Sequence, residues 1–419
     1  MINIGSFIFV VECLTLRFKN AKMDENSTYE FLLDLPLIEV TKVELEKRTL
    51  VINCRSKLGS GICPCCQQKT SEVNQYYERK VSDMSISGRD VLLNLEVRQF
   101  YCSVCTRYFS EQFDFVSEHS QTTTRQAKWI FMLCEKQAHS QVAALIGISV
   151  TQVANIYQQG ATAVLAACNR YSMVRNLGID EIALRKGKGD YVCVLTDLDR
   201  GWVIDILPFR DKSQLIAHFQ SKGTDFLKQI ENVTCDMWDG YISVAKAMFP
   251  NSAIIIDRFH VAMHLNEAID SQRKALRKEN KEIAELKNIK WALLKNPADL
   301  TQKEKEKLII VFKTLPILEE LYEMKNTFKA IFDANFSKSF ALEQIQHWLV
   351  QANVVANQYL NKFVKTFNNY KEWICNYFDN KLSNGITEGC NNRIKTIKRQ
   401  AYGMSNFDNF RLRVLTQLD

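Results

Sequence analysis

Several features of other protein classes are missing from this sequence. No apolar run reaches the roughly 20 residues that a membrane-spanning helix needs, so we expect no membrane span. The apolar residues 1–11 include no Lys or Arg, and Glu12 follows at once, which argues against a secretory signal peptide. No internal repeat, low-complexity tract or coiled-coil heptad is found, and no convincing triad is built on a histidine or cysteine nucleophile. Any catalytic chemistry must therefore rest on other groups.

The composition indicates a multidomain protein of a reducing compartment. A chain of 419 residues exceeds the usual length of one domain and can bury a large core. The net charge of +7 permits a nucleic-acid partner but does not require one. The 13 cysteines are scattered, and several, such as Cys193 and Cys235, lie inside apolar runs. This distribution suits a bacterial cytosol better than a secreted disulfide scaffold.

Residues 31–120 contain two Cys-x-x-Cys pairs, Cys63-Pro-Cys-Cys66 and Cys102-Ser-Val-Cys105. Four thiolates in two such pairs form a tetrahedral Zn²⁺ site, and because four protein ligands leave no open position, we expect the zinc to be structural. Cys65 could replace Cys63 or Cys66 as a ligand or remain a free thiol. The alternative to a zinc site is a set of unrelated core cysteines.

The interval between the two cysteine pairs is longer than in the usual zinc ribbon. It has room for two strands, 76–81 and 91–101, joined by a turn at Ser87-Gly88-Arg89. We therefore expect residues 31–120 to form a β-rich zinc-binding module, preceded by a leader without fixed structure over residues 1–30.

Residues 121–170 change to helical periodicity. One helix is expected over 126–138, and residues 140–157 resemble a helix-turn-helix in which Gly147 makes the turn and Ser149 caps the second helix. That helix should bury Val150, Val153, Ala154 and Tyr157, leaving a polar face that could read a DNA major groove: Thr151, Gln152, Asn155 and Gln158. The alternative is a plain helical hairpin in a linker.

Short β-branched runs begin near Tyr171, each bounded by Gly, Pro or charge as strands are. Helix-like stretches precede and follow the fourth run. The order of three strands, helix, strand, helix and strand is that of an RNase H-like α/β fold. The expected strands are 176–181, 190–197, 201–208, 233–236 and 253–257.

After His260 the sequence is helical for about 120 residues, with alternating Lys and Glu over 271–307 that we assign to a solvated face. The aromatic residues at helical spacing farther on should be core: Trp348, Tyr359, Phe363 and Phe367. We interpret this region as an all-α insertion into the catalytic fold. The domains are then 171–269 for the first part of the core, 270–383 for the insertion and 384–419 for a C-terminal helix.

The final helix should begin near Thr387 and end at Gly403. Glu388 lies off its expected apolar stripe, which consists of Ile386, Cys390, Ile394, Ile397 and Ala401. Four cations on the same helix could hold DNA phosphates: Arg393, Lys395, Lys398 and Arg399.

Asp180 and Asp236 each fall near a strand end, where ligands of open α/β sheets gather. With Glu388 they could hold two Mg²⁺ or Mn²⁺ ions for phosphodiester cleavage. An Asp at a strand end is more often a turn or cap residue, and spacing alone does not choose among the other carboxylates. The competitors are Glu181, Asp197, Asp199 and Asp205 for the first position, and Asp239 and Asp257 for the others.

The whole pattern resembles the transposases of the ISL-three family of bacterial insertion sequences, a DDE-type group. The resemblance runs from about Phe31 to Leu415. It rests on the paired cysteines, the helix-turn-helix and six further motifs: Gly178-Ile-Asp180-Glu181, Asp236-Met-Trp-Asp-Gly-Tyr241, Asp257-Arg-Phe-His260, Asn384-Gly-Ile-Thr-Glu388-Gly-Cys-Asn-Asn392, Ile397-Lys-Arg-Gln-Ala-Tyr-Gly403 and Asn406-Phe-Asp-Asn-Phe-Arg-Leu412. One departure is Gln67, where the family usually has Gly. Gln67 follows the first Cys-x-x-Cys pair, and we call each such pair with its turn a knuckle.

The resemblance implies that Asp180, Asp236 and Glu388 are the DDE triad of an RNase H-like core. It implies that the N-terminal modules bind the terminal inverted repeats of the element as double-stranded DNA, and that the protein cuts and joins strands into target DNA. Arg258 and His260, just past the last strand, could contact the cut phosphate or a flipped base, as Asp257 could support the site. An ordinary histidine and a surface ion pair are the alternative.

Two ends must be cut together, so we expect a homodimer or larger assembly on DNA, in the bacterial cytosol and associated with the nucleoid. Two other functions fit the same residues. One is a DNA-binding protein derived from a transposase that has lost catalysis. The other is an RNase H-like nuclease that never joins strands.

Overall fold

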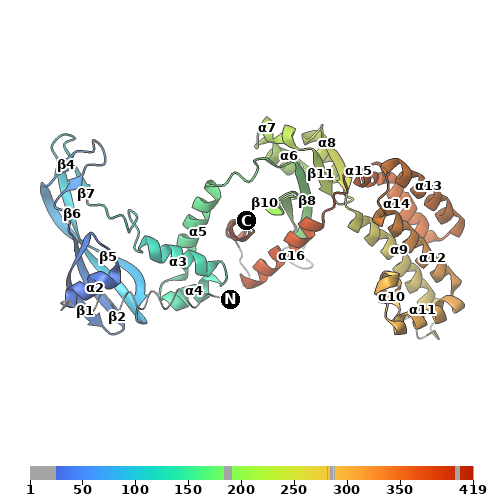
Figure 1. Cartoon of the computed structure of the whole chain (residues 1–419), viewed down its shortest axis with the longest axis horizontal. Helices are drawn as coiled ribbons and strands as arrows, with labels where there is room; N and C mark the ends of the chain where they lie inside the picture. The colour runs from blue at the N-terminus through green and yellow to red at the C-terminus, as the bar shows by residue number, and fades with distance from the viewer. Residues whose placement is uncertain are drawn as a thin grey trace. The chain divides into compact units, whose positions relative to one another are not determined.

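The computed structural model describes residues 25–183, 191–280, 282–283, 286, 288–401 and 406–418 (Figure 1). Contacts divide the chain into two compact units, Met1–Gly160 and Ala161–Asp419. Within the described ranges no helix is long and apolar enough to cross a membrane. Most of the expected leader lies outside these ranges, and helix α2 (Glu25–Leu33) occupies its end.

The first unit contains five strands of one sheet: β1 (Ile38–Glu46), β2 (Thr49–Ser56), β5 (Val73–Ile86), β6 (Arg89–Cys102) and β7 (Arg107–Ser110). Their order is β1-β2-β6-β5, and β7 pairs with β6. β2 and β6 run parallel, and the other pairs are antiparallel. Apolar side chains from alternate positions of these strands, together with Leu33 of α2, form the core. This is the β-rich module that the sequence predicts.

The two strands expected between the cysteine pairs are the middle of a longer hairpin, β5–β6. Its turn is where the sequence places it. Ser87 and Gly88 both adopt left-handed conformations, with φ of 51° and 74°. Two consecutive left-handed residues match the twist of a tight hairpin.

Three helices follow: α3 (Thr124–Cys134), α4 (His139–Ile146) and α5 (Val150–Ala166), and the boundary between the two units falls within α5. The expected turn between the last two is confirmed, because Gly147 has φ of 79° and the Ser149 hydroxyl accepts the Gln152 N–H at 3.2 Å. Val153 and Tyr157 are buried as expected, but Val150 is 49% exposed. The prediction for Val150 was wrong because the first residue of a helix has no preceding turn to pack beside it.

The second unit holds a mixed sheet of five strands: β8 (Asn176–Ala183), β9 (Tyr191–Asp197), β10 (Trp202–Leu207), β11 (Asn232–Cys235) and β12 (Ala253–Ile256). The order is β10-β9-β8-β11-β12. β9 is antiparallel to both of its neighbours, whereas β8, β11 and β12 run parallel. The carboxyl ends of β8, β11 and β12 therefore lie at one edge of the sheet, which we call the carboxylate edge.

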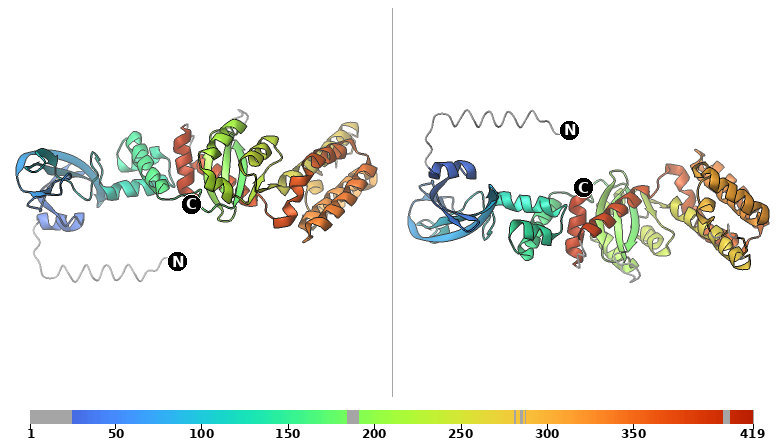
Figure 2. Two further views of the ribbon diagram at one scale, coloured as in Figure 1. Left: turned by 90° about the horizontal axis from the view of Figure 1, so that it is seen from above. Right: turned by 90° about the horizontal axis from the view of Figure 1, so that it is seen from below.

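Helices cover both faces of this sheet (Figure 2). Ile179 and Leu195 face a core shared with α6 (Lys212–Gln220), α7 (Thr224–Gln229) and α8 (Asp239–Met248). Ile182 and Val194 point the opposite way, toward α16 (Gly385–Gln400) and α17 (Phe407–Gln417). Alternate residues of each strand thus serve two separate apolar layers.

The region between β12 and α16 is helical, as expected. Its helices are α9 (Arg258–Glu279), α10 (Lys290–Leu294), η2 (Pro297–Asp299), α11 (Gln302–Thr314), α12 (Pro316–Asp333), α13 (Lys338–Val355), α14 (Gln358–Cys375) and α15 (Tyr377–Asn380). Trp348, Phe363 and Phe367 are buried as predicted, and Tyr359 is partly buried against the same core.

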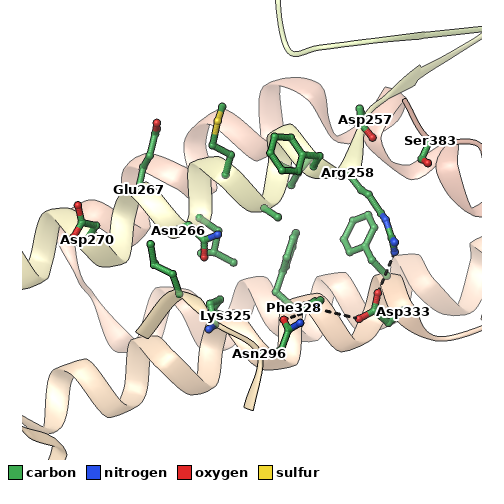
Figure 3. Close-up of a pocket in the computed structure, with 18 of the residues that line it drawn as sticks. Asp257, Arg258, Asn266, Glu267, Asp270, Asn296, Lys325, Phe328, Asp333 and Ser383 are labelled. Carbon is green, nitrogen blue, oxygen red and sulfur yellow. Dashed lines mark hydrogen bonds and ion pairs between the residues drawn. The ribbon is translucent and has the colours of Figure 1, made fainter. Parts of the chain in front are cut away.

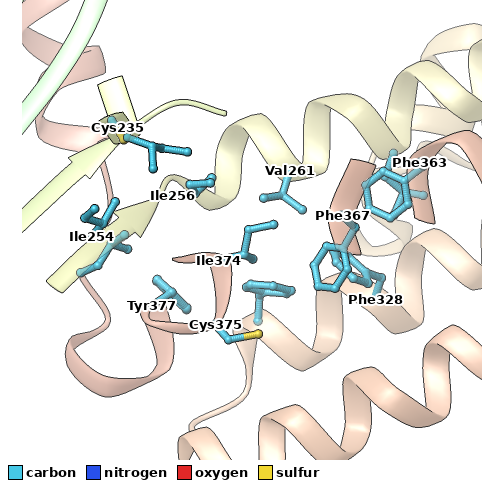
Figure 4. Packing of buried hydrophobic residues seen from close by; sticks show 14 of the residues in the cluster. Cys235, Ile254, Ile256, Val261, Phe328, Phe363, Phe367, Ile374, Cys375 and Tyr377 are labelled. Carbon is cyan, nitrogen blue, oxygen red and sulfur yellow. The ribbon is translucent and has the colours of Figure 1, made fainter. Parts of the chain in front are cut away.

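The core of this helical region continues into the core of the sheet. Figure 4 shows the succession from Ile254 and Ile256 on β12, through Val261 and Ile374, to Phe328 of α12. Polar contacts reinforce the junction, since the Asn376 side chain donates to the Ile254 carbonyl at 2.8 Å. The helical region and the sheet are therefore fixed to each other and are not merely tethered.

Candidate functional site

The two cysteine pairs of the first unit come together at the β3 (Gly61–Ile62) and β4 (Lys69–Thr70) hairpin and the β6–β7 turn. The sulfur atoms of Cys63, Cys66, Cys102 and Cys105 all lie within 4.8 Å of one another. In the part of the chain that the structure describes, this is the only compact group of three or more His, Cys, Asp or Glu ligand atoms. Cys65 is exposed and lies outside the group. Four clustered thiols with no oxygen ligand suit a structural Zn²⁺.

The first knuckle favours the thiolate form that zinc requires. Backbone N–H groups, that of Cys66 foremost, lower the pKa of Cys63 to about 7. In both knuckles the residue after the second cysteine is left-handed, with φ of 61° at Gln67 and 51° at Thr106. That conformation explains why the position of Gln67 suits Gly.

Asp180 and Asp236 lie on neighbouring parallel strands at the carboxylate edge. Asp180 is inside β8, paired across from Val194, and Asp236 follows the last residue of β11. The two Asp180 oxygens each accept one hydrogen bond, Oδ1 from the Glu181 N–H at 2.7 Å and Oδ2 from Asn391 Nδ2 at 2.8 Å. Asp236 Oδ1 is buried and has no hydrogen-bond partner.

Both carboxylates are held in an environment that opposes their negative charge. Burial raises the pKa of Asp236 to about 6, His260 opposes that rise, and Asp180 and Glu181 add to it. Burial also raises the pKa of Asp180, against the effect of its hydrogen bond from Glu181. A bound cation would remove this penalty, so an unpartnered oxygen and two destabilised carboxylates fit a site for a divalent metal ion.

Glu388 is an exposed residue in the first turn of α16, which starts at Gly385, two residues before the expected Thr387. It lines a cavity of about 830 Å³ together with Asp257, Arg258 and Ser383. Figure 3 shows Asp257 and Ser383 at one end of that cavity, which extends along α9 and α12. Asp180, Asp236 and Glu388 are not gathered as tightly as the four thiols.

A buried polar cluster fixes α16 to the sheet. Asn384 Oδ1 accepts from the hydroxyls of Thr234 at 2.9 Å and Thr387 at 2.7 Å, and Thr387 also bonds Thr196 at 2.6 Å. Gly178 of β8 makes room for this cluster. A Cβ there would lie 2.5 Å from Thr387 Oγ1, 2.9 Å from Asn384 Oδ1 and closer still to Thr196 Oγ1.

The apolar stripe of α16 is only partly as expected. Cys390, Ile394 and Ile397 are buried, whereas Ile386 is 42% exposed and Ala401 is half-buried. The prediction for Ile386 was wrong because the inward position in the first turn belongs to Thr387. Gly403, expected to end the helix, lies outside the described residues.

The competing carboxylates are engaged elsewhere. Asp197, the last residue of β9, and Asp199 lie at the opposite end of the sheet, where Asp197 pairs with Arg200 and Asp199 accepts from Asn176. Asp205 forms a two-point ion pair with Arg411 at 2.6 and 2.9 Å. Three competitors remain at the carboxylate edge: Glu181, paired with Arg210, Asp239, bonded to Tyr370, and Asp257, which accepts the Asn384 N–H.

The three residues expected to support the site lie at the same edge. Asp257 is buried and accepts the Asn384 N–H at 3.2 Å, so it helps to hold α16. His260 is half-buried and influences the pKa of both aspartates. Arg258 forms an ion pair with Asp333 at 3.0 Å, which is the surface ion pair considered as its alternative role.

The residues expected to contact DNA are mostly accessible. Thr151, Gln152 and Asn155 are exposed on α5, although Gln152 Oε1 also accepts from the Ser149 N–H and hydroxyl. On α16, Arg393, Lys395 and Arg399 are exposed and Lys398 is half-buried.

Sequence reasoning missed Asn384, Thr387 and Asn391 as parts of the site. The sequence did contain one signal. Thr387 and Asn391 are polar residues four positions apart, which places them on the same face of the helix, and that face is buried. It also missed Arg210, which pairs with Glu181 at 2.7 Å and lies over the Tyr191 ring.

Comparisons with known proteins agree with this architecture. A family model of DDE type for ISL3 elements, described as transposase, matches residues 177–414, and the zinc-finger of the transposases of IS204, IS1001, IS1096 and IS1165 matches residues 60–105. The transposase of IS1001 from Bordetella parapertussis is 26% identical over 372 residues, covering 88% of this chain and 91% of that protein. The transposase of IS1557 from Mycobacterium tuberculosis is 25% identical over 310 residues, 68% of each chain. This chain therefore belongs to the ISL3 family of DDE transposases of bacterial insertion sequences.

Proposed function

We propose that Asp180, Asp236 and Glu388 hold divalent metal ions, Mg²⁺ or Mn²⁺, and that this site cuts and joins DNA strands. The observation that carries the proposal is the placement of Asp180 and Asp236 on adjacent parallel strands, with α16 bonded to Asp180. The strand order and directions support an RNase H-like fold for the sheet.

The donor set suits these ions because Mg²⁺ prefers a few carboxylate oxygens and keeps several waters. The bound metal would supply an activated attacking oxygen and charge neutralisation at the leaving oxygen. The chain holds Asp180 in one orientation through the Glu181 N–H and Asn391, and leaves Asp236 Oδ1 without a competing donor.

The proposed reaction has two transfers at the same site. Water attacks the phosphorus at the element end, and the bond to the 3′-oxygen breaks, so that this oxygen takes a proton and leaves as a 3′-hydroxyl. That hydroxyl then attacks a phosphodiester of target DNA, and a target 3′-oxygen leaves. The exposed cations Arg393, Lys395 and Arg399 on α16, with Lys398, would bind phosphates near the cut.

The N-terminal unit would recognise the terminal inverted repeats. Two features of helices α4 and α5 support a helix-turn-helix. A glycine turn joins them and Ser149 caps the second helix, and Thr151, Gln152 and Asn155 are exposed on that helix, where they could contact DNA. The zinc module would act beside it on double-stranded DNA. Two ends must be cut in concert, so a dimer or larger assembly would form on DNA in the bacterial cytosol, at the nucleoid.

The test is cleavage of a labelled DNA carrying the element end, with Mg²⁺ or Mn²⁺ added. We expect Asp180→Ala, Asp236→Ala and Glu388→Ala each to abolish nicking while the mobility shift of the same DNA is retained. Asp239→Ala is the matched control, because Asp239 lies near Asp236 but is exposed and bonded to Tyr370. Cleavage that survives the first three substitutions would overturn the assignment, and products without joined strands would indicate a nuclease.

A further inference from the structure

We propose that Asn391 is the positioning residue that orients Asp180 for metal binding. This inference rests on the proposed metal site. Asn391 comes from α16, far from Asp180 in sequence, yet its Nδ2 donates to Asp180 Oδ2 at 2.8 Å. The Asn391 side chain is only 4% exposed. Nothing in the family motif by itself distinguishes it from its neighbour Asn392.

The contacts of Asp180 leave it able to bind a cation. One donor reaches each oxygen, the Glu181 N–H at Oδ1 and the Asn391 amide at Oδ2. A carboxylate oxygen has two lone pairs, so each oxygen keeps one for a metal. With both oxygens held, the carboxylate plane is fixed before the ion arrives.

A neutral donor suits this task better than a charged one. An arginine or lysine at the same place would orient Asp180 but would also cancel the charge that attracts a dication. An amide fixes the carboxylate and leaves its charge in place. Partners of this kind, one step removed from a metal, typically change metal affinity by about 10- to 100-fold when removed.

The same helix carries Glu388 one turn before Asn391. Its register is set by the bonds of Asn384 and Thr387 to the sheet. Glu388 and Asn391 lie on the same rigid helix. The hydrogen bond from Asn391 to Asp180 therefore also fixes the position of Glu388 relative to Asp180. Asn391 Oδ1 is also buried and unpartnered, so the side chain makes no other hydrogen bond that would explain its burial.

The chain supplies its own control, because Asn392 follows directly on α16 and its side chain is exposed. The experiment measures Mn²⁺ affinity of the full-length, zinc-loaded protein by electron paramagnetic resonance of free Mn²⁺, with no DNA. We expect Asn391→Leu, which keeps the branched shape of the side chain but not its hydrogen-bonding groups, to weaken binding about tenfold. Asn392→Leu should leave the affinity unchanged.

A second variant separates orientation from simple packing. Asn391→Ala removes the same amide but leaves space where Asn391→Leu fills it, so we expect both to weaken Mn²⁺ binding about equally, although they change the melting temperature of the metal-free protein differently. A purely structural asparagine would make both variants lose affinity in parallel with stability, and that result would overturn the inference. So would an Asn391→Leu protein that binds Mn²⁺ as Asn392→Leu does, while Asp180→Asn abolishes binding. If Asp180→Asn and Asp236→Asn also bind normally, the metal site itself is wrong and the inference fails with it.

Discussion

The thiol cluster of the first unit and the carboxylate edge of the second bring their ligands together in opposite ways. Each cysteine pair comes from one short knuckle, and all four sulfur atoms lie within 4.8 Å of one another. The carboxylates come from two strands and a helix and are less tightly gathered. Local turn geometry sets each cysteine pair of the closed site, whereas the open site depends on how a helix docks across a sheet.

The pKa values of the candidate ligands also differ between the two sites. Backbone N–H groups lower the pKa of Cys63 to about 7, toward the charged form that zinc binds. At the carboxylate edge, burial raises the pKa of Asp236 to about 6, against the charged form. In the first site the backbone favours the Cys63 thiolate, whereas the neighbouring Cys66 thiol raises the pKa of Cys105. In the second site burial is the main cause of the penalty, and in both a bound ion would relieve it.

The largest expected effect comes from breaking the closed site. Cys63→Ser or Cys102→Ser should abolish zinc binding and unfold the β3–β4 hairpin and the knuckles, because zinc contributes on the order of 10 kcal/mol in such modules. Zinc content by mass spectrometry and hydrogen exchange of the two units would show this. Cys65→Ser is the control, since Cys65 is exposed and outside the cluster. Equal loss of zinc in Cys65→Ser would mean that Cys65 is a ligand.

The next effect concerns the docking of α16. Gly178→Ala should destabilise the second unit by about 3 kcal/mol, because its Cβ would force apart the hydroxyls of Thr196 and Thr387. Calorimetry of the full chain would measure the shift. Gly389→Ala is the matched change, since nothing lies within 4 Å of a Cβ there and the helix should gain stability. If the two substitutions have similar effects, the polar cluster does not limit how α16 packs.

A smaller effect tests how much the buried negative charge of Asp236 lowers the stability of the metal-free protein. The pKa of Asp236 is raised from 3.8 to about 6, so between these values the folded state binds more protons than the unfolded state. Stability of the metal-free protein should therefore fall as pH rises through this window. Asp236→Asn should gain roughly 3 kcal/mol at most at pH 7.5 and nothing below the window.

Thermal melting of the second unit without metal, at several pH values, would check this dependence. Asp239→Asn serves as control, because Asp239 is exposed and bonded to Tyr370. A gain from Asp236→Asn that is the same at low and neutral pH would show that the buried charge is not its cause.

Much of the fold follows from the sequence because strands and knuckles carry local signals. Runs of Val and Ile bounded by Gly or charge mark β9 and β12 to within a residue or two of their ends. The hairpin β5–β6 extends beyond the predicted strands, because ladder hydrogen bonds continue where polar residues such as Gln75 and Ser82 give no hydrophobic pattern.

The missed part of the site is polar and buried. Periodicity counts apolar residues, so Thr387 and Asn391 look like surface positions of α16, and Ile386 like a core position. Their partners Thr196 and Asp180 lie on strands about 200 residues earlier, and only the docked helix brings them together. No local pattern encodes such pairs.

The smallest expected effect concerns the backbone conformation of Gln67 beside the thiol cluster. If turn geometry alone prepares the closed site, relieving its one left-handed glutamine should improve it. Gln67 has φ of 61°, so Gln67→Gly should stabilise the zinc-loaded knuckle by about 0.5–1 kcal/mol. Zinc release to a competing chelator would slow accordingly. Gln68→Gly, at a neighbour without positive φ, should slow nothing and cost some stability through chain entropy. Faster zinc release from Gln67→Gly would mean that its side chain, and not its backbone, supports the knuckle.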